Sequence, residues 1–144
     1  ASRVLTHELV RHRIASYSQR SQRYVEEKEP RYITPPELAS ELDDAGLIII
    51  AEPSFTISGI FTLAMDHAWR AYARLLALGV KKEIARYVLP NACETQIVMT
   101  MNFRELRHFI KLRTSKKALP EMRCVAGMVL EICKQKAPSV FDDL

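Results

Sequence analysis

The chain has 144 residues, of which 48% are hydrophobic and 26% are charged, and it carries a formal net charge of +4. A chain of this length can bury a core without disulfides, and its composition is unlike that of a disordered or coiled-coil protein. Its longest apolar runs fall far short of the roughly 20 residues that cross a bilayer. We therefore expect one soluble domain over residues 1–144, with no membrane partner.

Apolar spacing and turn residues predict eight elements in chain order. The first four are a helix over 2–11 capped by Ser2, a strand or extended loop over 16–25, a short helix starting at Glu37 after Pro35 and Pro36, and a long core helix over 55–78 with Ser54 as cap and Gly79 as stop. The last four are one or two helical turns over 81–89, a strand over 95–101, a helix over 103–113, and a helix from Pro120 to Pro138 whose apolar face is Met122, Val125, Val129, Ile132 and Cys133. The pattern predicts an α+β fold, rich in helix, with a small antiparallel sheet.

The three cysteines, Cys93, Cys124 and Cys133, form an odd set without a CxxC pair. This pattern predicts neither a disulfide framework nor a zinc ribbon, and it favours a reducing, cytoplasmic location. Because Cys124 and Cys133 lie in an apolar helical segment, we expect both to be buried. No apolar signal core precedes the first patterned segment, so the chain is expected to begin within a domain.

Charge is segregated along the chain. Residues 1–23 hold five arginines against one acid, residues 24–66 hold nine acids against two bases, and residues 67–144 hold fourteen lysines and arginines. The two basic parts predict an anionic partner. Nucleic acid and a small phosphate-bearing ligand both fit this balance, and composition does not separate them.

A metal site is not expected at the histidines near the start of the chain. His7 and His12 are the first and last residues of the segment H-E-L-V-R-H, which is similar to the zinc-protease helix. That helix needs histidines four residues apart, whereas five residues place these two roughly 140° apart around a helix. The pair therefore cannot hold one metal from a single face.

Arg11-His12-Arg13 is followed by Ser21 and Arg23, which brings three guanidinium groups, an imidazole and a hydroxyl to one short segment. Such groups bind phosphates, although a solvated basic loop has the same composition. The spacing R-H-R-x7-S resembles the signature of flavin-dependent thymidylate synthase. Segments 85–91 (ARYVLPN), 101–104 (MNFR), 108–113 (HFIKLR), 121–123 and 137–141 resemble that family's later blocks, in the same order. The resemblance covers nearly the whole chain and is weakest between residues 36 and 56.

The resemblance implies an enzyme that methylates dUMP to dTMP, with FAD as cofactor and with NADPH and 5,10-methylenetetrahydrofolate as co-substrates. It implies a homotetramer whose active sites are shared between subunits. The implied FAD contacts are Arg11, His12, Arg13, Ile14, Ser18, Gln19, Asn102, Arg104, His108 and Lys117. The implied dUMP contacts are Glu8, Gln19, Ser21, Gln22, Arg23, Arg86 and Arg113. Of these, Arg113 is the implied catalytic residue, because it would stabilise negative charge developing on the pyrimidine.

The sequence departs from the family pattern in several places. Glu8 stands where some members have glutamine, and Ser18-Gln19 stand where some have Asn-Glu. Lys117 stands where several members carry a histidine, and Leu119 replaces a common glutamine. The family's domain also has further chain ahead of the arginine signature, so its N-terminal portion, with strands and flavin contacts, is expected to be missing here.

Two alternatives stay open beside the enzyme. A nucleic-acid-binding domain would use the arginines on phosphate backbone, but no helix-turn-helix or aromatic strand platform is visible, so we expect no nucleic-acid partner. A non-catalytic fragment of the same family would bind dUMP without flavin. The cysteine-dependent thymidylate synthase is set aside, because Cys93 lies in N-A-C-E-T without the Pro-Cys-His setting of that enzyme's nucleophile.

Overall fold

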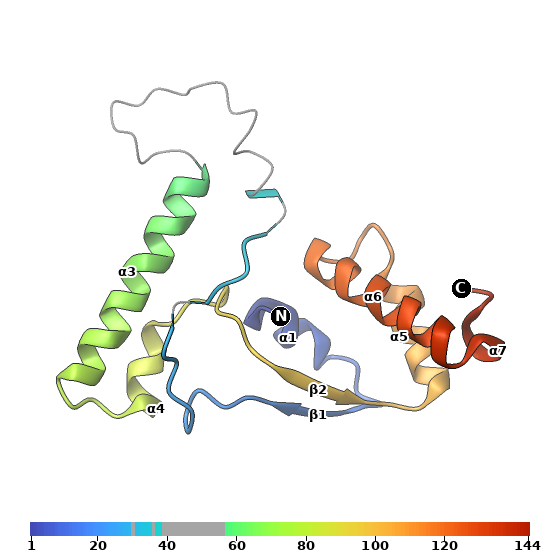
Figure 1. The fold of residues 1–144 in the computed structure, drawn as a ribbon, viewed down its shortest axis with the longest axis horizontal. Coiled ribbons are helices and arrows are strands. Elements are labelled where there is room, and N and C mark those ends of the chain that lie inside the picture. The colour runs from blue at the N-terminus through green and yellow to red at the C-terminus, as the bar shows by residue number, and fades with distance from the viewer. Residues whose placement is uncertain (30, 36, 39–56) are drawn as a thin grey trace. The chain divides into compact units, whose positions relative to one another are not determined.

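The computed structural model covers the whole chain and describes every residue except 30, 36 and 39–56 (Figure 1). The chain divides into two compact units. The first unit comprises residues 1, 3–19 and 96–144, and the second comprises residues 2 and 20–95. The prediction of a single domain over residues 1–144 stays a prediction.

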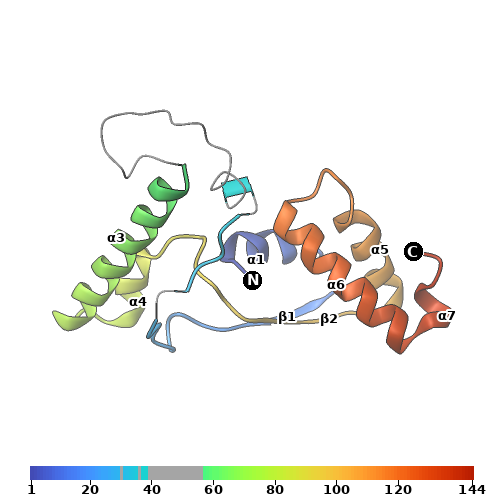
Figure 2. The same cartoon turned by 45° about the horizontal axis from the view of Figure 1, so that its top comes forward.

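The first unit is built from four helices and a two-stranded sheet. Its elements are α1 (Arg3–Leu9), β1 (Ser16–Gln19), β2 (Ile97–Thr100), α5 (Phe103–Arg113), α6 (Pro120–Lys136) and α7 (Pro138–Phe141). The strands are antiparallel, with Ser16 opposite Thr100 and Gln19 opposite Ile97. Alternate residues of each strand are exposed, as expected for a sheet with one covered face. Both views show α1 lying along this sheet (Figures 1 and 2).

The core of the first unit draws on all four of its helices. Its fully buried members are Leu5, Leu9, Phe109, Ile110, Met122, Ala126 and Phe141, and Tyr17, Ile97 and Met99 pack against them from the sheet. Burying several large aliphatic and aromatic side chains contributes about 1.5–3 kcal/mol each to folding. The helix-rich α+β prediction with a small antiparallel sheet is therefore confirmed.

The termini of α5 and α6 lie where the sequence predicts them. Asn102 caps α5 with its side-chain oxygen, which accepts a hydrogen bond from the Glu105 backbone N–H at 2.9 Å. Pro120 occupies the first turn of α6, and that helix ends at Lys136 before Pro138 opens α7.

The predicted apolar face of α6 is only partly correct. Met122 and Ala126 are buried, but Ile132 is 57% exposed and Cys124 is exposed. Two residues correspond to about 200° around a helix, so Cys124 lies opposite Met122 and away from the core. The expectation that Cys124 is buried is wrong, and Cys133 is only partly buried.

The second unit contains α3 (Ile57–Ala77), α4 (Lys82–Ala85) and the 3-10 helix η1 (Arg86–Val88). Gly79 ends α3 in a left-handed conformation with φ of 82°. Its N–H donates to the Leu76 carbonyl at 2.9 Å, and the Val80 N–H donates to the Leu75 carbonyl at 3.0 Å. This is the Schellman pattern, and it confirms Gly79 as the helix stop.

The prediction that α3 is a core helix is largely wrong. Among the residues of α3, Tyr72 alone is buried, whereas Ile57, Ile60 and Leu63 are about half exposed. The helix contacts α4 and η1, and Phe61 and Tyr72 also contact Tyr32 and Glu27. The predicted cap Ser54 and residues 55–56 lie outside the described residues.

Three smaller predictions have mixed outcomes. The extended segment over 16–25 is a strand over 16–19 only, because residues 22–24 form a turn closed by the Val25 N–H on the Ser21 carbonyl at 3.0 Å. Residues 37 and 38 are helical, and the continuation of that helix lies outside the described residues. Ser2 pairs with Glu94 in an isolated bridge, and its role as a cap stays a prediction.

Candidate functional site

A hydrogen-bonded cluster in the first unit joins the end of α5 to α1 and to the turn that follows α1. Arg113, the last residue of α5, donates from Nε to Nε2 of His12 at 2.8 Å and from Nη1 to Oε1 of Glu8. The Arg113 side chain is 13% exposed. Three residues that the sequence resemblance assigns to substrate or cofactor contact therefore lie together.

The imidazole of His12 is enclosed and uncharged. His12 is 6% exposed, and its ring meets Phe109 edge to face with centroids 5.2 Å apart. The pKa of His12 is lowered from its ordinary value of 6.5, first by burial and then by the positive charge of Arg113. At neutral pH the ring is therefore neutral and can accept a hydrogen bond.

The turn that carries His12 is fixed by β1. The Tyr17 hydroxyl lies 2.9 Å from the Leu9 carbonyl oxygen and 2.8 Å from that of His12, which ties the end of α1 to the turn. Burial raises the pKa of Tyr17, so its hydroxyl stays protonated as a donor. In β1, Gln19 donates from Nε2 to the Thr6 hydroxyl at 3.0 Å. Sequence reasoning missed Tyr17, whose position two residues from Gln19 on the covered face of a strand was the available signal.

Most of the predicted flavin contacts are exposed side chains of the first unit. Arg11, Arg13, Ile14, Ser18, Asn102, Arg104, His108 and Lys117 are all exposed. No carboxylate within the described ranges pairs with Arg11, Arg13 or Arg104. These guanidinium groups are available to an anion, whereas the side-chain oxygen of Asn102 is already used as the cap of α5.

The remaining predicted dUMP contacts lie in the second unit, and two of them, Arg23 and Arg86, bond to Glu83. Arg23 donates from Nε to Oε2 of Glu83 at 3.0 Å, and Arg86 donates from Nε to the Glu83 carbonyl oxygen at 3.2 Å. Ser21 accepts from the Arg23 backbone N–H at 3.2 Å. Sequence reasoning missed Glu83, whose position one helical turn before Arg86 was the available signal.

Gln22 is a buried amide with an unused donor. Gln22 is 4% exposed, and its Nε2 finds no hydrogen-bond acceptor among the described residues. A buried donor without a partner costs about 1–3 kcal/mol. The predicted dUMP set thus divides between the units, with Glu8, Gln19 and Arg113 in the first and Ser21, Gln22, Arg23 and Arg86 in the second.

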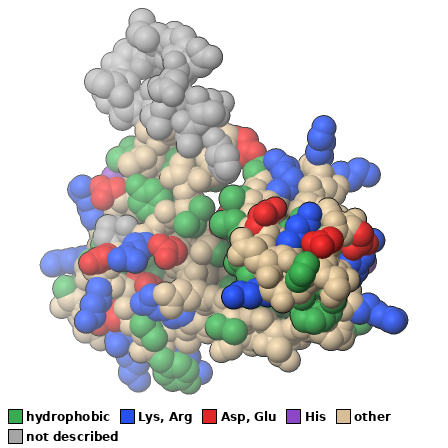
Figure 3. Space-filling model, turned by 45° about the vertical axis from the view of Figure 1, so that its right-hand side comes forward, with side chains coloured by type: hydrophobic (Ala, Val, Ile, Leu, Met, Phe, Trp, Pro, Cys, Tyr) green, Lys and Arg blue, Asp and Glu red, His purple; other side chains and the backbone are tan. Residues whose placement is uncertain are grey.

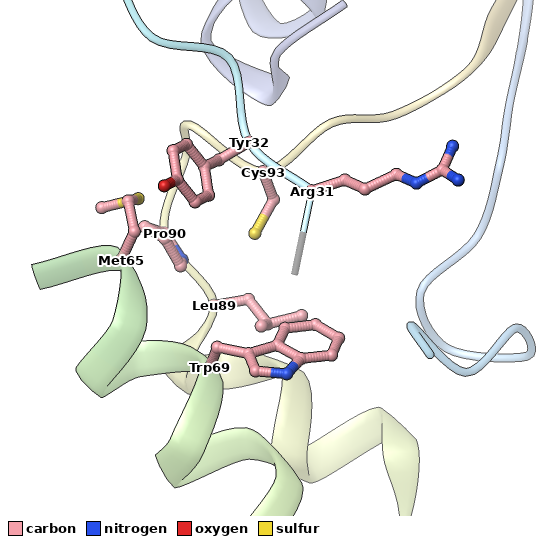
Figure 4. A pocket seen from close by; sticks show the side chains of 7 residues that line it. All are labelled: Arg31, Tyr32, Met65, Trp69, Leu89, Pro90 and Cys93. Atoms are coloured by element: carbon pink, nitrogen blue, oxygen red, sulfur yellow. The ribbon is translucent and has the colours of Figure 1, made fainter. Parts of the chain in front are cut away.

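A separate pocket of the second unit contains none of the predicted site residues. It is lined by Arg31, Tyr32, Met65, Trp69, Leu89, Pro90 and Cys93. The Cys93 sulfur and the Trp69 ring point into it, whereas the Arg31 guanidinium points away from the other side chains (Figure 4). Its lining is mainly apolar, with Arg31 as the one charged residue named in it.

The basic segment at the start of the chain is partly neutralised. Arg20 pairs with Glu27 at 3.2 Å, and Arg23 pairs with Glu83. On the face drawn in Figure 3, Lys and Arg side chains are interspersed with acidic ones and do not gather in one patch. Within the described residues, no group of three or more His, Cys, Asp or Glu side chains is placed to hold a metal ion, and no helix has the length and apolar character of a membrane span.

The chain is similar to known proteins along nearly its whole length. Residues 1–139 match the family model described as thymidylate synthase complementing protein. The flavin-dependent thymidylate synthase of Clostridium tetani is 40% identical over 156 residues, which cover 97% of this chain and 57% of the relative. The proteins of the same name from Corynebacterium diphtheriae and Geobacter sulfurreducens are 41% and 43% identical, over 99% of this chain and 57% and 56% of the relatives.

The chain thus spans a little over half the length of these curated relatives. The family match, in contrast, covers nearly every residue of this chain, including the arginine signature, Glu83 and all of α5. The chain therefore belongs to the thymidylate synthase complementing protein family.

Proposed function

We propose that the chain acts as a flavin-dependent thymidylate synthase, which converts dUMP to dTMP with a carbon from 5,10-methylenetetrahydrofolate. The observation that carries the proposal is the guanidinium of Arg113, held on two sides by His12 and Glu8. No described residue accepts a hydrogen bond from Nη2 of Arg113. The Arg113 guanidinium is permanently charged and held in place, and its Nη2 can still donate, so it suits a ligand that develops negative charge.

Arg113 is the proposed catalytic residue. When a pyrimidine carbon attacks the one-carbon unit, negative charge develops on the ring. A preorganised guanidinium stabilises that charge without reorganising during the reaction. Glu8 would lie beside the nucleotide, with its carboxylate moderating the charge of Arg113, and Gln19 would add an amide contact.

The phosphate of dUMP is assigned to Ser21, Gln22, Arg23 and Arg86. The pair between Arg23 and Glu83 is exposed, so a phosphate dianion can displace that carboxylate at small cost. Arg86 supplies a second guanidinium, and two such forks bind a phosphate bidentately. The unused Nε2 donor of Gln22 would find an acceptor in the same ligand.

The residues assigned to FAD fit an anionic, partly apolar cofactor. Arg11, Arg13 and Arg104 have no carboxylate partner among the described residues, and Ile14 is an exposed apolar side chain that follows Arg13 in sequence. Ser18, Gln19, His108, Lys117 and the amide of Asn102 supply further polar groups. Bound FAD supplies the reducing equivalents that NADPH provides. The chain's own residues bind the pyrophosphate, hold the nucleotide and keep His12 neutral beside Arg113.

The assembly and location are part of the same proposal. We infer a homotetramer in which Arg11 and Arg13 reach the flavin site of a neighbouring subunit, as the family resemblance implies, whereas the enclosed imidazole of His12 contacts Arg113 of its own chain. A reducing, cytoplasmic location suits the three cysteines, all of which are free thiols.

The test is an assay of the purified chain with dUMP, methylenetetrahydrofolate, NADPH and FAD. We expect dUMP-dependent NADPH oxidation together with dTMP formation. Arg113→Ala should lower kcat by about 10²–10³-fold, as loss of a charge-stabilising donor does elsewhere. Lys111→Ala, which removes an exposed cation from the same helix, should change kcat little.

Other outcomes would contradict the proposal. Binding of dUMP without flavin or turnover would indicate a non-catalytic member of the family. Affinity for random duplex that falls steeply with salt and is not competed by dUMP would indicate a nucleic-acid-binding domain.

A further inference from the structure

Glu105 is a partly buried acid that neither the arginine signature nor the later motifs assign to the site. It lies in the first turn of α5, where Asn102 holds its backbone N–H. Its Oε1 is 3.9 Å from Nδ1 of His12, and the side chains are 15% and 5% exposed. At this distance the contact is electrostatic rather than a direct hydrogen bond.

The contact between Arg113 and His12 fixes the proton of the imidazole. Arginine stays protonated in proteins, so Nε of Arg113 can only donate. Nε2 of His12, which lies 2.8 Å away, must therefore present a lone pair. A neutral imidazole carries one proton, and here it resides on Nδ1, the nitrogen that faces Glu105.

We propose that Glu105 is a positioning residue for Arg113: its carboxylate holds His12 in the Nδ1–H tautomer, so that Nε2 accepts from Arg113 and fixes the guanidinium. The inference rests on the proposed function and adds a residue to that site. The contacts then connect four groups in order: the negative Glu105, the neutral His12, the positive Arg113 and the negative Glu8. The free Nη2 edge of Arg113 is oriented by both of its neighbours, not by Glu8 alone.

The arrangement makes the role of Glu105 visible in a pH profile. The charged groups that face His12 are Arg113, Glu105 and His108 from α5 and Glu8 from α1. Glu105 and Glu8 raise the pKa of His12, whereas burial, Arg113 and His108 lower it. Protonated His12 would have no lone pair for Arg113, so activity should fall as pH drops through the His12 pKa. Removing Glu105 lowers that pKa, and the acid limb of the profile should move to lower pH.

The experiment compares the wild-type chain with Glu105→Ala and Glu105→Gln by ¹⁵N NMR of the histidine side chains, with His12 assigned through a His12 variant. Wild type should show the Nδ1–H tautomer at His12. Glu105→Ala should show a mixture with the Nε2–H form, and Glu105→Gln, which keeps an acceptor but loses the charge, should lie between them. Glu131→Ala, which removes an exposed carboxylate of α6, is the matched control and should leave the His12 signals unchanged.

The kinetic arm measures kcat and KM for dUMP from pH 5 to 9. Glu105→Ala should lower kcat about tenfold, at the lower end of the cost of losing a supporting residue at other sites, with a smaller change in KM. Its acid limb should lie at lower pH than that of wild type. A merely structural role would change stability without moving either the tautomer or the acid limb.

The two readouts separate this inference from the proposed function. A wild-type Nε2–H tautomer, or a Glu105→Ala variant with an unchanged tautomer and acid limb, would overturn the role of Glu105 even if dTMP is formed. The NMR measurement needs no turnover. A tautomer shift in a chain that forms no dTMP would therefore support the Glu105–His12–Arg113 arrangement while the proposed function failed.

Discussion

The helices α5 and α3 differ in how many of their side chains are buried, and the shorter helix buries more. With 11 residues, α5 buries Phe109 and Ile110 almost completely and brings Glu105 and Arg113 to His12. With 21 residues, α3 buries Tyr72 alone. Most helical stability in proteins comes from packing an apolar face, not from intrinsic propensity. The short helix is therefore the structural centre of its unit, and the same residues that hold it in place orient the candidate site.

The largest expected effect comes from breaking the packing of α5. Phe109→Ala removes a fully buried ring that contacts both the core and His12, and it should lower the free energy of unfolding by about 3–5 kcal/mol. The measurement is urea denaturation followed by circular dichroism.

The matched change in α3 should have a far smaller effect. Ile60 is half exposed on α3, so Ile60→Ala should change the free energy of unfolding by less than about 0.5 kcal/mol. Equal losses for the two variants would mean that the exposed side of α3 is covered in solution, and the contrast between the helices would fail.

The same contrast explains which parts of the fold the sequence could predict. The bounds of α5 follow from local signals, an Asn cap and an uninterrupted amphipathic pattern, and the structure reproduces them. The burial of α3 does not follow, because periodicity shows which side chains share a face of a helix but not whether that face has a partner. Cys124 was misplaced for a related reason, since an apolar helix does not reveal which of its faces meets the core.

The sequence names candidate site residues but not the contacts between them. The resemblance named Glu8, His12 and Arg113, and the structure brings these three together. It did not name Glu83 or Glu105, the acids that pair with Arg23 and face His12. Those pairings join segments far apart in the chain, so no local spacing encodes them.

The next largest effect is expected at the C-terminus of α3. Gly79 has φ of 82°, and a side chain there would meet nothing within 4 Å. Gly79→Ala should therefore lower the free energy of unfolding by about 1–2 kcal/mol through backbone strain alone. Gly127→Ala is the control, because Gly127 lies inside α6 with equally open surroundings, and alanine there should stabilise by up to about 1 kcal/mol. Similar changes of the same sign in both variants would contradict the left-handed stop.

A smaller effect tests the one buried side chain of α3. The Tyr72 hydroxyl accepts a hydrogen bond from the Glu27 backbone N–H at 3.3 Å. Tyr72→Phe keeps the ring and removes the acceptor, so it should lower the free energy of unfolding by about 0.5–1.5 kcal/mol. Tyr87→Phe, at a hydroxyl on an exposed ring, should have no measurable effect. An unchanged free energy of unfolding in Tyr72→Phe would show that water replaces the hydroxyl at the Glu27 N–H.

The smallest effect concerns the exposed ion pair that joins α5 to the residues after α7. Arg107 donates to both carboxylate oxygens of Asp143 at 2.5 Å, and these hydrogen bonds lower the pKa of Asp143 from 3.8 to about 2. A carboxylate whose pKa is lower in the folded state binds fewer protons there than in the unfolded chain, so it stabilises the fold above its unfolded pKa. Its contribution should be complete above about pH 4 and lost as the pH falls through about 2. Asp143→Asn should therefore lower the urea midpoint slightly at pH 6 and by clearly less at pH 2, where the folded-state carboxylate is about half protonated. A difference at pH 2 as large as that at pH 6 would show that Asp143 anchors the chain end through packing and not through charge.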